Sequence, residues 1–367
     1  MPRAISLAGA VVVAGLLAAA GLALRFGPTL TLTIALAFPS AERWLAPLFP
    51  DPTREEIVIQ VNGRQLHADL YRPPKPRAAL LLVHGLSRAG RRHSDLVRLA
   101  ELLARRRELV LVPEFEGLTA FKLTGREVEE VRGALDHLTG VHRTVGVAGL
   151  SFGTGPALLA AADRPQLRLV GSFGGYADLR TVIAFVTTGV HAFQGQRQFQ
   201  RQEEYNRWKL LALLSGYVEP DGDRRLLEAI AERKLENPME VTASLEAGLQ
   251  GPGRSVMNLV LNRREDTVAP LLAALPARVQ EALDQLSPLA VVPRLSGRLL
   301  IAHGAGDESI PFTESLRLAH ASGGRARLVI LQTFHHTGPR PFFESVRLRA
   351  QDGWNLMLLV DDLLTAQ

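Results

Sequence analysis

A serine lies between two glycines in the stretch GLSFG, residues 149–153, after small apolar residues and before a small-residue helical pattern. A serine hydroxyl is a useful nucleophile only when it is held exposed and a base removes its proton. A sharp turn from strand to helix raises the side chain above a sheet edge, and the flanking glycines leave room for that turn. The first N–H groups of the following helix would face a developing oxyanion. The pattern therefore predicts that Ser151 is a nucleophile.

An acid and a base follow Ser151 in the order that a hydrolytic triad requires. Asp307 lies in LLIAHGAGDESIP, and His335 and His336 lie in LVILQTFHHTGP, each just past an apolar run. The aspartate would hold the imidazole in the correct tautomer and stabilise its cation. The residues alone leave the choice between the two histidines open. Asp178, in GGYADL after another apolar run, is an alternative acid.

The stretch LLVHGLSRAG supplies the remaining group that acyl transfer needs. A backbone N–H just after His84-Gly85 can turn toward the serine, so the amides of Leu86 and Phe152 are the predicted oxyanion donors. Loss of one such donor typically costs about 3–4 kcal/mol of transition-state stabilisation. We expect His84 itself to be structural, and His303 in the stretch AHG likewise.

Short, continuous apolar runs surround these residues and predict a doubly wound α/β fold. Such runs are typical of strands buried on both faces of a parallel sheet, and helical patterns lie between most of them. An alternating stretch around Asn62-Gly63 predicts an antiparallel hairpin ahead of the parallel strands. The six runs are residues 78–85, 108–115, 144–151, 167–175, 297–304 and 326–334.

The interval between the fourth and fifth runs is too long for a simple crossover. It contains amphipathic stretches, so we expect a mostly helical lid or cap over residues 177–296. The remaining predicted parts are an α/β core over 46–176 and 297–367, and an N-terminal membrane anchor with a juxtamembrane segment over 1–45.

The anchor prediction rests on residues 4–24, an uncharged apolar run between Arg3 and Arg25. About 20 such residues span a bilayer as a helix. We expect an uncleaved anchor in a bacterial inner membrane, with its orientation open because arginines flank both sides. A cleaved export signal, with a small-residue site at residues 35–37, is the alternative, and a buried helix of the fold is another.

A strand ending in HG, then GLSFG, then HGAGDESIP and a terminal histidine loop together resemble the α/β-hydrolase superfamily over residues 55–176 and 297–360. The resemblance implies an acyl-enzyme intermediate that water hydrolyses, and no cofactor. In that family a glycine often precedes the catalytic histidine. His335 occupies that place, so the resemblance selects His336 as the base, with His335 as the alternative.

Composition excludes several other classes of function. The absence of cysteine excludes disulfides, thiolate metal sites and a cysteine nucleophile. The net charge of +5 comes from scattered arginines without a nucleic-acid motif, so no nucleic-acid partner is expected. No His/Asp/Glu cluster has metal-ligand spacing, and we expect no metal.

These features together predict a membrane-anchored serine hydrolase that cleaves small-molecule or lipid-like carboxylic esters or thioesters. An acyltransferase or peptidase with the same triad, or a non-catalytic envelope scaffold that retains a hydrolase fold, are the alternatives. The substrate, the acyl acceptor and the oligomeric state cannot be read from these patterns.

Overall fold

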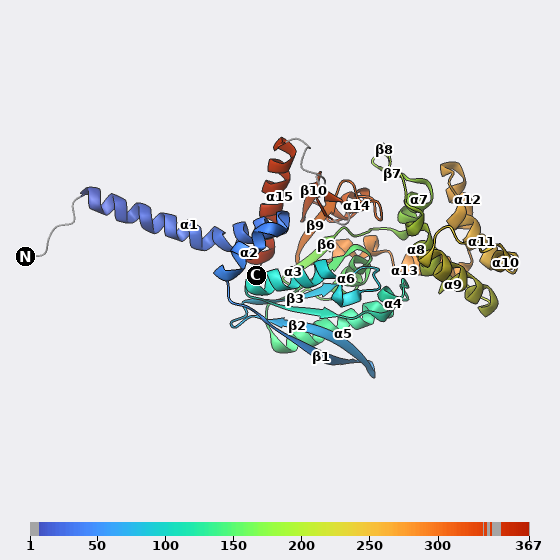
Figure 1. The fold of residues 1–367 in the computed structure, drawn as a ribbon, viewed down its shortest axis with the longest axis horizontal. Helices are drawn as coiled ribbons and strands as arrows, with labels where there is room; N and C mark the ends of the chain where they lie inside the picture. Colours follow the sequence, from blue (N-terminus) through green and yellow to red (C-terminus); the bar gives the residue numbers. More distant parts are fainter. Residues whose placement is uncertain (1–6, 333, 336–337, 340–345, 367) are drawn as a thin grey trace, which may run out of the picture.

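A computed structural model describes residues 7–332, 334–335, 338–339 and 346–366, with side chains described for residues 21–332 and 347–366. An eight-stranded sheet forms its centre (Figure 1). In spatial order the strands are β1 (Thr53–Val61), β2 (Arg64–Arg72), β4 (Glu108–Pro113), β3 (Ala78–Val83), β5 (Val145–Leu150), β6 (Leu169–Phe173), β9 (Arg298–Gly304) and β10 (Ala326–Leu331).

The pairing of these strands confirms the predicted fold class. Strand β1 is antiparallel to β2, and β2 is antiparallel to β4, whereas all other neighbours in this sheet are parallel. Asn62 and Gly63 join β1 to β2 with φ angles of 49° and 77°, the left-handed pair that a tight primed turn needs. Each of the six predicted apolar runs contains one of the parallel-paired strands.

Strand β3 shows why these strands are continuously apolar. Ala79, Leu81 and Val83 pack into the cluster on one face of the sheet, and Leu80 and Leu82 pack into the cluster on the other. The first face carries α5 (Arg126–Val141), α6 (Thr154–Ala161) and α14 (Thr313–Ala321). The second face carries α3 (Ser94–Arg105) and α15 (Val346–Thr365). With both faces covered, polar residues would be costly at either.

A long segment separates β6 from β9, and we call residues 174–297 the inserted segment. Its helices gather at the end of the molecule opposite the N-terminal helix (Figure 1). In chain order it contains α7 (Leu179–Thr188), β7 (Val190–Phe193), β8 (Gln196–Phe199), α8 (Glu204–Ser215), α9 (Asp221–Glu236), α10 (Ala243–Ala247), α11 (Gly251–Leu261), α12 (Val268–Ala273) and α13 (Ala277–Gln285).

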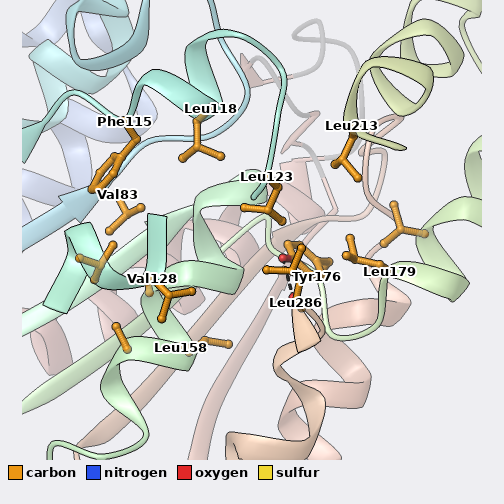
Figure 2. Packing of buried hydrophobic residues seen from close by; sticks show 14 of the residues in the cluster. Val83, Phe115, Leu118, Leu123, Val128, Leu158, Tyr176, Leu179, Leu213 and Leu286 are labelled. Atoms are coloured by element: carbon orange, nitrogen blue, oxygen red, sulfur yellow. Dashed lines mark hydrogen bonds between the residues drawn. The ribbon is translucent and has the colours of Figure 1, made fainter. Parts of the chain in front are cut away.

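The inserted segment shares one apolar core with the first face of the sheet. Leu213 of α8 and Leu286 lie in the same cluster as Val83 of β3 (Figure 2). The Tyr176 hydroxyl, fully buried, donates a hydrogen bond of 2.9 Å to the carbonyl oxygen of Leu286, drawn as a dashed line in Figure 2. This bond joins the start of the inserted segment to the residue that follows α13, near the segment's other end.

Residues 7–24 of the N-terminal run lie in helix α1 (Leu7–Ala37), which continues through Arg25 and Pro28 onto the body of the fold. Leu32 and Ala35 are buried in the cluster that includes α15, so the last turns belong to the globular structure. Arg25 forms an ion pair of 2.6 Å with Asp361 of α15.

The membrane predictions made from this run are wrong. Across the described residues, no helix combines the length and apolar character that a membrane crossing requires. The finding overturns the predicted localisation, that of a protein anchored in a bacterial inner membrane. The sequence pattern was misleading because an apolar run that ends in the core of a fold has the same composition as one that enters lipid.

Candidate active site

Ser151 lies at a sharp turn between β5 and α6, as the glycine spacing predicts. Its φ angle is +50°, a left-handed conformation that a residue with a Cβ atom rarely adopts. Such a backbone costs of the order of 1–3 kcal/mol and persists only where the surroundings enforce it. The Ser151 side chain remains partly exposed, at the edge where the parallel strands end.

The two glycines of the stretch are required by close backbone contacts. A Cβ atom on Gly149 would lie 2.4 Å from the Cα atom of Thr154, and one on Gly153 would lie 2.3 Å from the carbonyl oxygen of His84. Neither contact can be relieved by rotating a side chain, because the opposing atoms are backbone. The turn around Ser151 is therefore packed tightly against the end of β3.

His84 fixes the loop that follows β3. Its Nε2 accepts a hydrogen bond of 3.0 Å from the N–H of Phe115, so Nδ1 carries the proton and donates to the carbonyl oxygen of Gly85 at 2.9 Å. Burial lowers the pKa of His84, which favours this neutral form. The ring is thus a structural support for the loop that carries Leu86.

Asp307 follows β9 and is buried. Its Oδ1 accepts hydrogen bonds from the N–H groups of Ser309 at 2.8 Å and Ile310 at 3.1 Å. Nε2 of His303 lies 3.4 Å from Oδ2 and 2.9 Å from the carbonyl oxygen of Ile310. Two backbone donors and a buried imidazole thus hold the carboxylate in one orientation.

The alternative acid, Asp178, caps a helix. Its Oδ1 accepts a hydrogen bond of 2.8 Å from the N–H of Arg180 in the first turn of α7. Its own N–H donates to the buried carboxylate of Glu314 at 3.0 Å. This arrangement accounts for the aspartate as the start of α7.

His335, one of the two candidate histidines, follows β10 in the chain. His335 lies in the two-residue strand β11 (Phe334–His335), which pairs with β12 (Gly338–Pro339). His336 lies outside the described residues. The choice between them therefore stays a prediction.

A small cavity of about 30 Å³ opens at Ser151, with room for about two water molecules. Its walls also include both predicted oxyanion residues, Leu86 and Phe152, and Ser309 from the loop of Asp307. We call this cavity the serine pocket. The inserted segment supplies its other lining residues, which are Leu179, Val182, Ile183, Val186, Asn206, Lys209, Leu210, Leu213 and Leu283.

Two helices of the inserted segment face the serine pocket with regular spacing. The apolar residues of α7 recur at intervals of three and four, the period of one helix face. Helix α8 repeats this spacing, but its stripe begins with Asn206 and Lys209 before it becomes apolar. The pocket therefore has apolar walls and a polar end.

Asn206 connects the polar end to the loop of Asp307. Its Nδ2 donates to the carbonyl oxygen of Glu308 at 2.9 Å, and its Oδ1 accepts from the Ser309 hydroxyl at 3.3 Å. Lys209 Nζ lies 3.4 Å from the same Oδ1. The sequence analysis missed both residues; the signal was a lone lysine inside the apolar run of WKLLALL.

No cluster of three or more His, Asp or Glu side chains in the described part of the chain could hold a metal ion. The described residues that line the pocket supply two serine hydroxyls, one amide and one lysine, and the Asp307 carboxylate lies in the adjoining loop.

Comparison with solved structures agrees with the fold. An acylaminoacyl peptidase from Pyrococcus horikoshii, in an orthorhombic crystal form, matches with a TM-score of 0.51 and 12% identity, over 89% of this chain and 43% of that one. An acylaminoacyl peptidase in complex with Z-Gly-Gly-Phe-chloromethyl ketone matches with a TM-score of 0.50 and 12% identity, over 85% and 42%. The chain thus spans less than half the length of these peptidases.

The esterase domain of a Rhodothermus marinus protein matches with a TM-score of 0.46 and 15% identity, over 85% of this chain and 96% of that one. No protein-family model and no curated protein sequence matches the chain. At these identities the two peptidase matches show that the chain has the α/β-hydrolase fold.

Proposed function

We propose that this protein is a serine hydrolase that cleaves carboxylic esters or thioesters. The observation that carries the proposal is the left-handed backbone of Ser151 at a strand-to-helix turn. A fold that needed only a turn residue could use glycine there without strain. Strain at a partly exposed serine beside a pocket is typical of an activated nucleophile.

In the proposed reaction, Ser151 Oγ attacks the carbonyl carbon while a histidine takes its proton. The base is His336, with His335 as the alternative, and Asp307 stabilises the resulting imidazolium. The N–H groups of Leu86 and Phe152 stabilise the oxyanion. The tetrahedral intermediate expels the alcohol or thiol, which receives the proton from the imidazolium. Water then attacks the acyl-enzyme in the same way and releases the acid.

The inserted segment is proposed to act as a lid. The serine pocket holds about 30 Å³, which is less than an ester group and its acyl chain require. Substrate entry therefore requires α7 and α8 to move relative to the sheet, and closure afterwards would exclude water from the acyl-enzyme.

Covalent labelling tests the nucleophile. The full chain is treated with a fluorophosphonate and assayed with short p-nitrophenyl esters, because removal of α1 would expose its contacts with α15. Ser151→Ala should lose both labelling and turnover. Ser296→Ala, at an exposed serine away from the pocket, is the matched control and should keep both. An unlabelled wild type would refute the proposal and favour a non-catalytic scaffold.

Separate alanine variants of the histidines test the base. Loss of turnover in only one of His335→Ala and His336→Ala identifies it, with an expected fall of about 10³-fold or more in kcat/KM. Retention of turnover in both would contradict the proposed triad.

The same groups would serve an acyltransferase or a peptidase, since the acyl-enzyme can be reached from an amide or captured by an alcohol or amine. Product analysis in the presence of added alcohols and amines separates transfer from hydrolysis. An acylated dipeptide substrate tests peptide cleavage.

A further inference from the structure

Among the residues whose side chains are described, Lys209 is the only charged one that lines the serine pocket. It lies one helical turn after Asn206 on α8, on the face that meets Ser151, Leu86 and Phe152. The other lining residues of α7 and α8 are aliphatic apart from Asn206. A cation is therefore held beside the candidate nucleophile in surroundings that solvate it poorly.

The contacts of Lys209 do not neutralise its charge. Its Nζ lies 3.4 Å from Asn206 Oδ1 and 4.5 Å from the centre of the Tyr205 ring. Glu203 and Asp307 act on it only at longer range, and no carboxylate in the described part of the chain forms an ion pair with it. Burial lowers the pKa of Lys209.

Fold stability does not account for a lysine at this position. The neighbouring residues Leu210 and Leu213 face the same pocket, and a methionine or leucine would pack there without the cost of desolvating an ammonium group. The cost of burying the Lys209 ammonium group would be offset if a bound substrate placed an anion beside it.

We propose that Lys209 binds a carboxylate of the substrate, so that the preferred substrates are esters that carry a carboxylate within a few bonds of the scissile group. Because Lys209 and Ser151 line the same cavity, one bound substrate could place a carboxylate at Lys209 and its reacting carbonyl at Ser151. A monoanion matches the single positive charge. The Ser309 hydroxyl and the Asn206 amide supply further polar groups at that end of the pocket. This inference rests on the proposed esterase function.

Matched pairs of esters test the proposal. Mono-p-nitrophenyl glutarate is compared with p-nitrophenyl valerate, which has the same chain length without the carboxylate. Phenyl acetate bearing a 4-carboxylate is compared with unsubstituted phenyl acetate, so that an anion on the leaving-group side is also tested. All rates are corrected for uncatalysed hydrolysis. The wild type should prefer the charged ester of at least one pair by about tenfold or more in kcat/KM.

Lys209→Met should lower that preference by about 10- to 100-fold, mainly by raising KM for the charged ester. Lys209→Arg should keep much of the preference. Lys75→Met, at an exposed lysine on the loop after β2, removes the same charge elsewhere and should change nothing. Free glutarate should slow fluorophosphonate labelling of Ser151 in the wild type and not in Lys209→Met.

The outcomes separate this inference from the proposed function. Turnover of neutral esters without a charged-ester preference, or a preference that Lys209→Met leaves intact, would overturn the role of Lys209 and leave the hydrolase standing. If Ser151 is labelled but neither ester pair is turned over, the labelling experiment with glutarate tests Lys209. Slower labelling in the wild type alone would support carboxylate binding by Lys209, and equal labelling rates would overturn it. An unreactive Ser151 overturns both proposals.

Discussion

Replacement of Arg168 by methionine should reveal how far the C-terminal helix depends on one buried ion pair. Arg168, just before β6, donates from Nη2 to Glu108 Oε2 of β4 at 2.5 Å. Its Nη1 donates to the carbonyl oxygen of Leu363 in the last turn of α15 at 3.0 Å and to that of Ala366, just after the helix, at 3.1 Å. Both charged side chains are 2% exposed. Burial lowers the pKa of Arg168 and raises the pKa of Glu108, so each charge depends on the other.

The expected magnitude follows from what the variant leaves behind. Arg168→Met strands the carboxylate of Glu108, and removal of one partner of a buried pair costs about 3–5 kcal/mol of unfolding free energy. The carbonyl groups of Leu363 and Ala366 lose their donor, which adds about 1 kcal/mol. The double variant Arg168→Met/Glu108→Leu removes both charges and should recover all but about 1 kcal/mol of the loss.

Urea unfolding followed by circular dichroism measures these differences. In Arg168→Met the pKa of the stranded Glu108 is raised in the folded state. Stability from its protonated form is then present at low pH and lost as pH rises through the folded pKa. The deficit should therefore be smaller at pH 5 than at pH 8. A loss below about 1 kcal/mol, or a double variant no more stable than the single, would refute the reasoning. Arg197→Met, in an exposed pair with Glu265, is the matched control and should cause no measurable loss.

Three further outcomes are expected. Gly153→Ala should abolish fluorophosphonate labelling, because its Cβ would lie 2.3 Å from the carbonyl oxygen of His84; normal labelling would contradict this account. Burial lowers the pKa of His84 in the folded state, so the neutral imidazole contributes stability at pH values above the unfolded pKa. Stability should therefore fall as pH drops below about 6.5, and His84→Gln should flatten the dependence of the urea midpoint on pH. Tyr176→Phe should lower the free energy of unfolding by about 1 kcal/mol, because it removes the hydrogen bond to Leu286. Urea unfolding measures the loss, and Ser296→Ala, at an exposed serine, is the control that should cause none.

Much of the sheet could be predicted because its physical signal is local. Strand β3 is apolar at each position since both of its faces are covered, and few other structures produce six such residues in a row. The turn at Asn62 and Gly63 could also be predicted, because asparagine and glycine are the residues that best tolerate positive φ angles.

The small hairpin β7–β8 was not predicted because its turn lacks a typical turn sequence. Gln194 and Gly195 adopt φ angles of 47° and 79°, close to those of Asn62 and Gly63, but glutamine is not a typical residue for that position. The hairpin is held by contacts with other elements, such as the hydrogen bond of 2.6 Å that Arg317 of α14 donates to the carbonyl oxygen of Ala192 in β7. Sequence propensity carries no record of such contacts.

Helix α8 was the more consequential omission. Residues on almost every side of α8 are buried, so the helix has no single apolar stripe by which a sequence pattern could identify it. Its polar first turn also resembles an exposed surface region. Asn206 and Lys209 acquire their place beside Ser151 only through the docking of α8 on the loop of Asp307. Contacts between segments this far apart leave no local pattern.

The contact between α1 and α15 has a consequence for how the chain is made. Leu32 and Ala35 pack in a cluster with α15, which begins at Val346. During synthesis they therefore emerge from the ribosome long before α15 has been made. At 5–20 residues per second that interval is roughly 15–60 s. A nascent chain therefore displays an apolar helix throughout most of its synthesis, and we expect its yield to depend on chaperones that bind such segments until the final helix emerges.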